Sequence, residues 1–335
     1  MDNLLLDSFV RLLGQISPPE AVRRAEADGA AAHIVHEVDE SGFLDALVPE
    51  SKGGSGLSIA DVVQLFFAAG EYLLPIPFAE TMVARALIAA SDAQPPRGRT
   101  IILWPSAPGG KLRSTLGPSG DSTSLALVQR DAEFRLLPIK LEERDADPFR
   151  MWSASPMLDA TPLLQFTLAH VDLLHWSAAI TAANMAGAIQ RLLAMSLTQV
   201  NERQQFGRTL SKFQVIQQQL SVFAERSVSA QVAARIGLVG SELILDGGRV
   251  AIAKSVANES ARVCASIAHA VHGAMGISEA HDLQLYTRRL ARWQISFGSE
   301  AYWQKHIGQR RLQSKEPTAV EFVRSLLAAG PETAH

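Results

Sequence analysis

Residues 202–214 read ERQQFGRTLSKFQ and separate two long stretches with a helical pattern. In the second stretch, apolar side chains recur at Ile216, Leu220 and Phe223, a spacing that places them on one face of a helix. The pattern predicts two helices joined by a turn whose tip carries Arg203 and several glutamines. A guanidinium beside amide groups suits an anion such as a pyrophosphate. The same spacing is equally typical of a polar corner between two helices.

The order of residue types in this stretch resembles a flavin-binding segment. Arg-x-x-Phe-Gly followed by Phe-Gln-x-x-Gln is similar to a segment of the acyl-CoA dehydrogenases. In that family, the arginine and phenylalanine of one subunit reach the FAD of its neighbour. The resemblance implies that Arg203 meets the FAD pyrophosphate and that Gln205, Phe206 and Gln214 line the adenosine side.

Composition limits the class of protein. The chain has 335 residues, enough for about two or three domains, and is 47% hydrophobic and 19% charged, as in globular proteins. The net charge of −3 implies no broad basic surface for nucleic acid. The single cysteine, Cys264, excludes an intrachain disulfide and a cysteine-cluster metal site. With no secretory signal and no apolar run of bilayer length, we expect a cytoplasmic protein that does not bind membranes.

Three regions with different patterning divide the chain. Residues 1–95 are helical, interrupted at 48–57, after which Ser58 is placed to cap the next helix. Residues 96–168 hold short β-type runs and predict a small β-domain of about six strands. Residues 169–335 return to long helices joined by short turns, which predicts a four-helix bundle.

Helix boundaries in the third region follow from glycines and apolar spacing. We expect helices over 171–201, 213–246 and 249–272, with Gly247 and Gly248 ending the second and a fourth helix beginning near Ser296.

The first region extends the resemblance. Residues 48–57 are similar to the Val-Pro-Glu-x-x-Gly-Gly-x-Gly-Leu segment of the acyl-CoA dehydrogenase N-terminal domain, and 75–81 lie where that family places Pro-Ile-Pro-Phe-Ala-Glu-Thr. The implied fold is mainly α: a helical N-terminal domain, a middle β-barrel-like domain and a C-terminal four-helix bundle. The family's Thr-Glu-Pro-x-x-Gly-Ser-Asp segment has no counterpart in the β-type region.

A second informative stretch is 269–277, HAVHGAMGI. Glycines at a helix end let the backbone approach a ligand, although an ordinary helix C-cap has the same pattern. The stretch resembles the Gln-x-x-Gly-Gly-x-Gly segment whose backbone lies along FAD in the family. Gly273 and Gly276 match that segment, whereas Ala270 and Ala274 depart from it.

Residues 279–289 continue like the short bacterial members used in steroid side-chain breakdown, in which Glu-His-Asp-Leu precedes Tyr-x-x-Arg-Arg. Arg288, Arg289 and Arg292 follow a helical pattern here. Two interpretations are open for them: pairing across a subunit interface, or contact with a CoA phosphate.

A general base is not apparent in the sequence. The reaction implied by the resemblance needs a carboxylate to remove the proton alpha to a thioester. The family's base is a glutamate in an aromatic-Glu-Gly sequence, and Phe297 stands in that place here. Some relatives carry the base on the first bundle helix, near Ser177 in this chain. Glu300 is the nearest substitute, and it fits the first turn of a helix equally well.

Two hypotheses follow from the resemblance. In the first, the chain is an oxidoreductase that oxidises an acyl-CoA from fatty acid or steroid side-chain breakdown, with FAD, with Glu300 or a partner's residue as base, and with an electron-transferring flavoprotein as oxidant. In the second, it is a non-catalytic subunit that brings Arg203 and the Gly273 loop to a partner's FAD. The family implies a homodimer, homotetramer or heterotetramer with a paralogous subunit.

Histidine pairs are the remaining candidates for chemistry. His33-x-x-His36 and His269-x-x-His272 have metal-compatible spacing but no cysteine or Glu-x-x-His support. We therefore expect helix-satisfied or solvated histidines and no metal.

Overall fold

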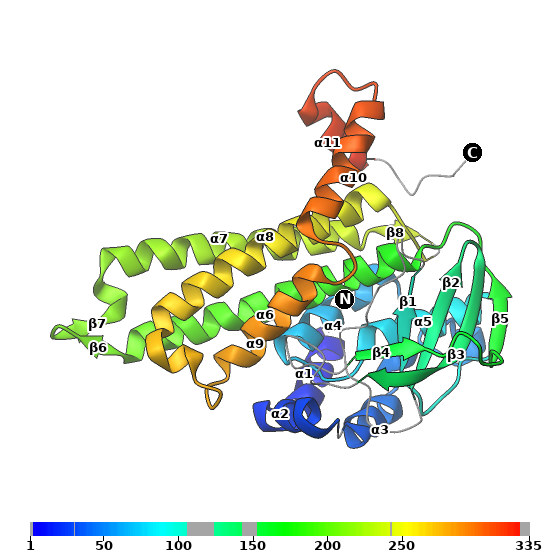
Figure 1. Ribbon diagram of the computed structural model, residues 1–335, viewed down its shortest axis with the longest axis horizontal. Helices are drawn as coiled ribbons and strands as arrows, with labels where there is room; N and C mark the ends of the chain where they lie inside the picture. Colours follow the sequence, from blue (N-terminus) through cyan, green and yellow to red (C-terminus); the bar gives the residue numbers. More distant parts are fainter. Residues whose placement is uncertain (1–2, 30, 106–123, 143–152, 242, 329–335) are drawn as a thin grey trace.

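A computed structural model describes residues 3–29, 31–105, 124–142, 153–241 and 243–328. Figure 1 shows a long helical bundle, a group of N-terminal helices along one side of it, and a twisted sheet at one end. The mainly helical class with a small β-region agrees with the sequence prediction.

The N-terminal region is helical, as expected. Its helices are α1 (Asn3–Ile16), α2 (Pro19–Asp28), α3 (Ala32–Glu40), α4 (Ile59–Glu71) and α5 (Phe78–Ala90). Ser58 begins α4 with a capping box, because its backbone N–H and its hydroxyl both donate to Asp61 Oδ2, over 2.9 and 2.7 Å. The predicted helix start is therefore confirmed.

The sheet has five strands in the described residues: β1 (Ile101–Trp104), β2 (Leu125–Arg130), β3 (Glu133–Glu142), β4 (Ser153–Pro156) and β5 (Leu164–Thr167). β1 runs parallel to β2, with Ile101 opposite Leu125, and the other pairs are antiparallel. β3 pairs with β5 along its first half and with β4 along its second half. The expected turn clusters at 107–111 and 117–122 lie outside the described residues.

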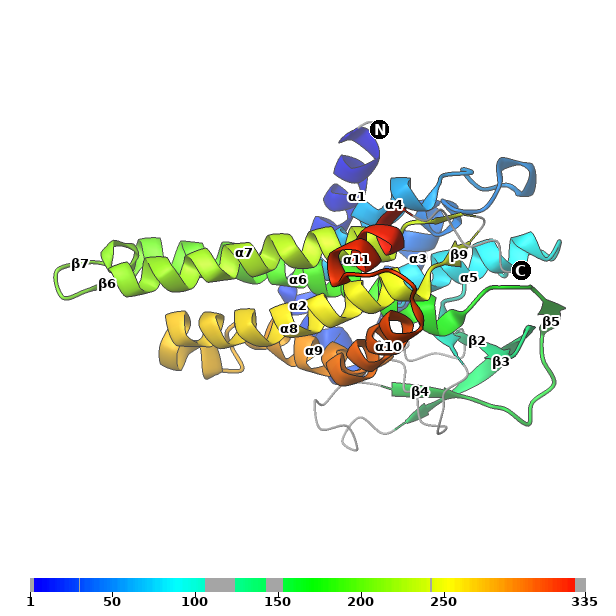
Figure 2. The ribbon, with the colours of Figure 1, turned by 90° about the horizontal axis from the view of Figure 1, so that it is seen from above.

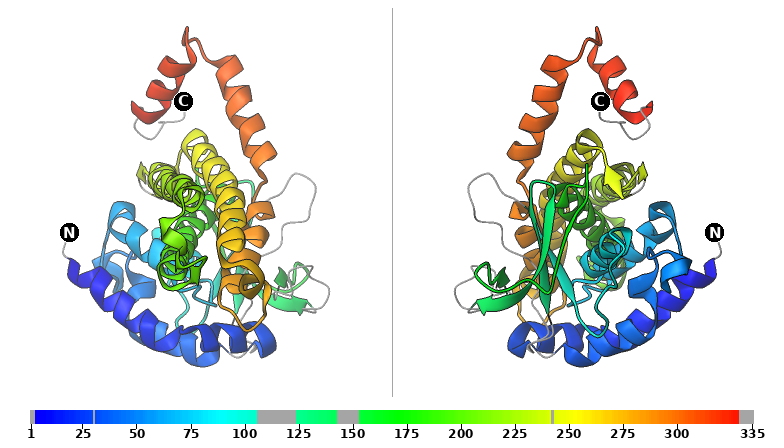
Figure 3. Two further views of the ribbon diagram at one scale, coloured as in Figure 1. Left: turned by 90° about the vertical axis from the view of Figure 1, so that its left-hand side faces the viewer. Right: turned by 90° about the vertical axis from the view of Figure 1, so that its right-hand side faces the viewer.

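Long helices build the C-terminal region: α6 (Leu173–Glu202), α7 (Gln214–Gly237), α8 (Gly247–His272), α9 (Leu283–Ile295), α10 (Glu300–Gln313) and α11 (Ala319–Ala328). α6, α7 and α8 pack against one another, and α9 packs on α6 and α8 (Figure 2). α10 packs on α8, and α11 folds back to form with it a helical hairpin that projects from one side of the bundle (Figure 3). Among the helices described, none has both the length and the apolar character to cross a membrane.

Two predicted boundaries in this region are wrong. α7 ends at Gly237, and Gly247 and Gly248 begin α8 instead of ending the preceding helix. The reason is Asp246, whose Oδ1 accepts from Arg249 N over 2.8 Å and caps α8. A short hairpin, β8 (Gly240–Ser241) and β9 (Ile244–Leu245), fills the interval.

The fourth helix of the bundle is also misplaced in the prediction. It is α9, which ends at Ile295, just before the Ser296 at which the prediction begins it. Leu283, Leu285 and Leu290 of α9 are buried, so a helical apolar face precedes the glycine turn.

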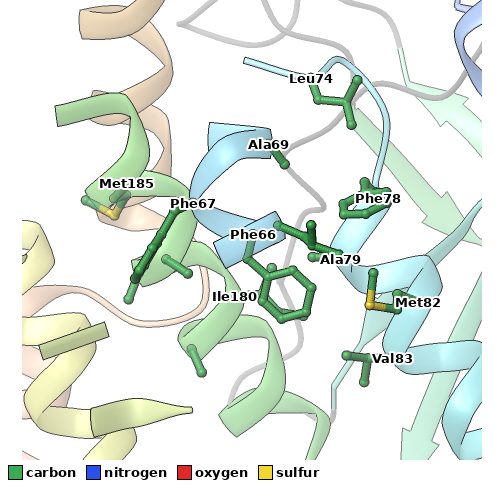
Figure 4. Packing of buried hydrophobic residues seen from close by; sticks show 14 of the residues in the cluster. Phe66, Phe67, Ala69, Leu74, Phe78, Ala79, Met82, Val83, Ile180 and Met185 are labelled. Atoms are coloured by element: carbon green, nitrogen blue, oxygen red, sulfur yellow. The ribbon is translucent and has the colours of Figure 1, made fainter. Parts of the chain in front are cut away.

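Close helix packing joins the N-terminal region to the bundle. A Cβ at Gly70 would overlap the carbonyl oxygen of Asn184, and a Cβ at Gly187 would overlap that of Phe67. The backbones of α4 and α6 therefore touch. Figure 4 shows Phe66 and Phe67 packed among side chains of α5 and α6, including Ile180 and Met185.

Arginines of α9 make the second link to the N-terminal helices. Arg288 and Arg289 both pair with Glu26 of α2, and the Arg289 Nη2 to Glu26 Oε1 distance is 2.7 Å. Arg289 Nη1 also donates to the carbonyl of Leu73 over 2.6 Å. The contacts of these two arginines are therefore within the chain, and their role at a subunit interface or a CoA phosphate stays a prediction.

Candidate functional site

The two stretches singled out in the sequence lie side by side. Arg203 follows the last residue of α6, and its Nη1 donates to the carbonyl of His272 over 3.3 Å. His272 ends α8, and the next residue is Gly273. A Cβ at Gly273 would lie 4.0 Å from Arg203 Nη1. Residues 69 positions apart in sequence therefore form one end of the bundle.

The hairpin tip beyond Arg203 is a tight two-stranded turn. β6 (Gln204–Gln205) pairs with β7 (Arg208–Thr209), and Phe206 and Gly207 between them both have positive φ, 53° and 76°. Two consecutive positive φ angles are typical of a type I′ hairpin turn. The Phe206 side chain is 90% exposed.

The remaining side chains of the hairpin differ in whether they are exposed or packed on another residue of this chain. Gln205 and Gln214 are exposed, as a role toward a second molecule requires. Arg208 instead lies over the ring of Phe213, 4.0 Å from its centroid. Arg203 and Arg208 therefore differ: one faces the Gly273 loop, and the other covers an aromatic ring.

The two glycines of the second stretch have different surroundings. Gly273 has φ 61° and ψ −142°, a conformation that side chains resist, so glycine leaves its backbone accessible beside Arg203. Gly276 is buried, and a Cβ there would lie 2.7 Å from Leu283 Cδ2. The small size of Gly276 thus serves packing, and its contact with a ligand stays a prediction.

A hollow of about 320 Å³ adjoins Arg203. Side chains of α6, including Arg191, Gln199 and Glu202, line it together with His272 and His281. Burial lowers the pKa of His272, as do the neighbouring His281 and His269, so its imidazole is neutral near pH 7.

One unpaired donor lies at this end of the bundle. Gln199 Nε2 is buried and has no hydrogen-bond partner among the described residues. It lies one helical turn before Arg203, whose backbone N–H donates to the carbonyl of Gln199. The backbone N–H of Gly273 is already used, because it donates to the carbonyl of His269. An unpaired amide donor and a guanidinium fit an anion with several oxygens, such as the diphosphate of FAD.

The candidate positions for a base carry no carboxylate. Phe297 is buried in the turn between α9 and α10, and Ser177 is buried in α6 with no partner for its Oγ among the described residues. Glu300 is the first residue of α10, where its Oε1 accepts from Gln304 Nε2 over 3.1 Å. This contact is that of an acidic residue in the first turn of a helix, and a role as base stays a prediction.

Two buried ionisable groups were not predicted from the sequence. Glu80, in α5, has no partner for its Oε2 among the described residues, and burial raises its pKa to about 8. Lys254, in the middle of α8, is fully buried, and burial lowers its pKa to about 7. The available signal was a charged residue at an apolar position of a helical pattern.

The histidine pairs have ordinary surroundings. His33 and His36 are exposed on α3, His269 Nε2 lies 3.1 Å from Thr287 Oγ1, and His272 Nδ1 lies 2.8 Å from the carbonyl of Ala268. Within the described ranges, no group of three or more histidines, cysteines and acidic residues is arranged to hold a metal ion.

Comparison with known proteins identifies similar chains. Residues 166–313 match the family model described as acyl-CoA dehydrogenase, C-terminal domain. The acyl-CoA dehydrogenase IpdE2 of Mycolicibacterium smegmatis is 24% identical over 307 residues, which cover 85% of this chain and 91% of that protein. The acyl-CoA dehydrogenase FadE34 of Mycobacterium tuberculosis is 25% identical over 316 residues, covering 86% of this chain and 44% of that protein.

Solved structures show the same fold. The Tcur3481–Tcur3483 steroid ACAD G363A variant has a TM-score of 0.78 at 20% identity and covers 91% of this chain and 96% of that one. The ChsE4–ChsE5 complex from Mycobacterium tuberculosis has a TM-score of 0.71 at 17% identity, covering 92% and 96%. The predicted resemblance and fold class are both confirmed.

Proposed function

We propose that this chain, whose residues 166–313 match the acyl-CoA dehydrogenase C-terminal domain, is a non-catalytic subunit of a heteromeric acyl-CoA dehydrogenase. In this role it completes the FAD site of a paralogous partner. The observation that supports this best is the contact of Arg203 with the His272 carbonyl beside Gly273, close to the unpaired amide donor of Gln199.

The roles of individual residues follow from this arrangement. Arg203 and Gln199 Nε2 would hold the diphosphate beside the backbone at Gly273, and Gln205, Phe206 and Gln214 would contact the adenosine side. FAD, when bound, supplies the hydride acceptor for oxidation of the acyl-CoA. The exposure of Phe206 supports a contact with something outside this chain.

The absence of a carboxylate at the two base positions of the family supports the proposal that a partner subunit supplies the general base. Phe297 fills one base position with an apolar ring, and Ser177 offers only a hydroxyl at the other. Neither side chain can take the proton alpha to a thioester near pH 7. The partner's carboxylate therefore does this work in the proposal.

The similar structures support both the assembly and the substrate class. Tcur3481–Tcur3483 and ChsE4–ChsE5 each join two differently named chains, and the first is called a steroid ACAD. By analogy, we propose a heterotetramer acting on a steroid side-chain thioester, with an electron-transferring flavoprotein as oxidant.

Co-expression tests the proposal. The chain is produced together with a paralogue that has an aromatic-Glu-Gly sequence, and flavin content and acyl-CoA oxidation are measured for the complex and for each chain alone. We expect a yellow, active complex and inactive single chains. Acyl-CoA oxidation by this chain alone would contradict the proposal.

A second candidate function is a self-sufficient FAD-dependent dehydrogenase in which Glu300, at the start of α10, acts as the base. Glu300 is the carboxylate that follows the Phe297 position most closely in sequence. This candidate predicts a purified chain that is yellow, is bleached by acyl-CoA, and loses that bleaching in Glu300→Gln. A colourless chain that FAD does not reconstitute would exclude it.

A further inference from the structure

Lys254 is a buried lysine whose hydrogen-bond partners are all neutral. Its Nζ donates to Asn258 Oδ1 over 2.7 Å, to the carbonyl of Trp293 over 2.9 Å and to the carbonyl of Gly298 over 3.3 Å. Burying an ammonium without a carboxylate is costly, so the neutral amine is favoured while Lys254 stays buried.

The acceptors of Lys254 belong to the joint between α9 and α10, residues 296–299. Trp293 lies in the last turn of α9, where the helix dipole is negative, and its carbonyl also accepts from the backbone N–H of Ser296 over 3.2 Å. Phe297 and Gly298 both have positive φ, 52° and 103°. Lys254 therefore ties α8 to a helix end and to a turn with an uncommon backbone conformation.

A second residue holds the joint from the other side. Trp303 Nε1, in α10, donates to the carbonyl of Phe297 over 3.0 Å. A Cβ at Gly298 would lie 2.8 Å from Tyr302 Cδ1 and would overlap Trp303 Nε1, so only glycine fits this turn. The joint thus sits between Lys254 and Trp303, at the start of the α10–α11 hairpin (Figure 3). The far part of that hairpin is held by Arg310, which pairs with Asp246, and by Arg249, which donates to the carbonyls of Leu326 and Leu327.

We propose that Lys254 is the positioning residue of this joint and couples the placement of the α10–α11 hairpin to one proton. Proton uptake by Lys254 favours an open joint, in which its ammonium reaches water. Proton loss favours the closed joint, because an amine needs no counter-charge and its N–H groups still reach Asn258 and Trp293. This inference is independent of the proposed function.

The surroundings of Lys254 support this direction. Burial is the cause that lowers its pKa to about 7. The ionisable groups that flank its acceptors in sequence are Arg292, Glu300 and Tyr302, and among the described residues the hydrogen bonds of Lys254 go to other, uncharged groups. An exposed lysine titrates near 10.4, so the open joint binds more protons than the closed one between pH values of about 7 and 10.

Amide hydrogen exchange of the full chain tests the coupling. After correction for intrinsic rates, we expect exchange at 295–303 to slow by up to about tenfold per pH unit between about pH 7 and pH 9, with a smaller change in α7. In Lys254→Met, the joint should lose this pH dependence. Lys305→Met, which removes an exposed lysine of α10, should keep it.

A measurement on the unmodified chain covers the case in which Lys254→Met does not fold. With lysine labelled at the side-chain carbon and nitrogen, one resonance should titrate near pH 7 and the others near pH 10. The proposal is overturned if every lysine titrates near pH 10, or if exchange at the joint is independent of pH in the unmodified chain.

Discussion

The two ends of α9 differ in what they offer to another molecule. Near its first residue lie the Gly273 turn and Arg203, with the unpaired Gln199 amide and the exposed Phe206 on the same part of the bundle. After its last residue lies Phe297, buried in a turn closed by Lys254 and Trp303. The first end presents a guanidinium and an amide donor, and the second presents a buried apolar side chain.

This difference suggests that a helical bundle can contribute side chains to a cofactor site without contributing a general base. Surface donors at a hairpin tip depend on local sequence, since 202–214 folds largely on itself. The position of a general base depends instead on how several helices pack together. An apolar side chain can fill such a buried position without loss of packing. The following predictions test how far the two ends differ.

The largest expected effect is at the closed end. Phe297→Ala should lower the free energy of unfolding by about 3–5 kcal/mol, because it removes a buried ring from the core. Urea denaturation measures this loss. The matched control is Phe206→Ala at the exposed end, which should change stability by less than about 0.5 kcal/mol. Equal losses in both variants would remove the distinction between the two ends.

The next effect is at the open end. In the co-expressed complex, Arg203→Ala should weaken flavin retention about 10- to 100-fold, since a charge-assisted contact with a diphosphate is lost. Flavin fluorescence released on dilution measures retention. Arg208→Ala is the control, because that guanidinium lies over Phe213. Unchanged flavin retention in Arg203→Ala would show that this end does not serve the cofactor.

The next prediction concerns the pH dependence of stability and the buried carboxyl group of Glu80, which lies in α5 and at neither end of α9. The folded pKa of Glu80, about 8, is raised above its usual value of 4.5, so its contribution to stability is present below pH 4.5 and is lost as pH rises toward 8. The slope should reach about 1.4 kcal/mol per pH unit, and Glu80→Gln should flatten it. Chemical denaturation across this window measures it, and an unchanged slope in the variant would refute the assignment.

The smallest expected effect on stability and activity is at Glu300, the nearest substitute for the family's general base. Glu300→Gln should change stability by less than about 0.5 kcal/mol and leave acyl-CoA oxidation by the complex unchanged, because this side chain contacts Gln304. A steady-state assay of the co-expressed complex checks it. Loss of turnover with normal folding would instead make Glu300 a reacting group, and the closed end would then be catalytic.

Local sequence was sufficient for part of the fold. The turn between α6 and α7, the cap at Ser58 and the end of α8 at His272 depend on neighbouring residues, and each was predicted. The end of α7 was missed because Asp246 caps the following helix, so the glycines after it mark a start instead of a stop.

Long-range contacts account for the rest. The pairing of Arg288 and Arg289 with Glu26 joins residues more than 260 positions apart, and no spacing rule connects them. The burial of Glu80 and Lys254 likewise depends on helices from other regions. In the candidate site, the positions of Arg203 and Gly273 were predictable from motifs, whereas the unpaired Gln199 amide was not.

The contact of α4 with α6 through Gly70 and Gly187 has a practical consequence for engineering. A random library at these two positions should return glycine almost without exception. If the chain is cut into fragments between α5 and α6, this seam gives the halves a shape-specific surface for reassembly. The pair could therefore be developed as a split reporter, with Gly187→Ala as the version that fails to reconstitute.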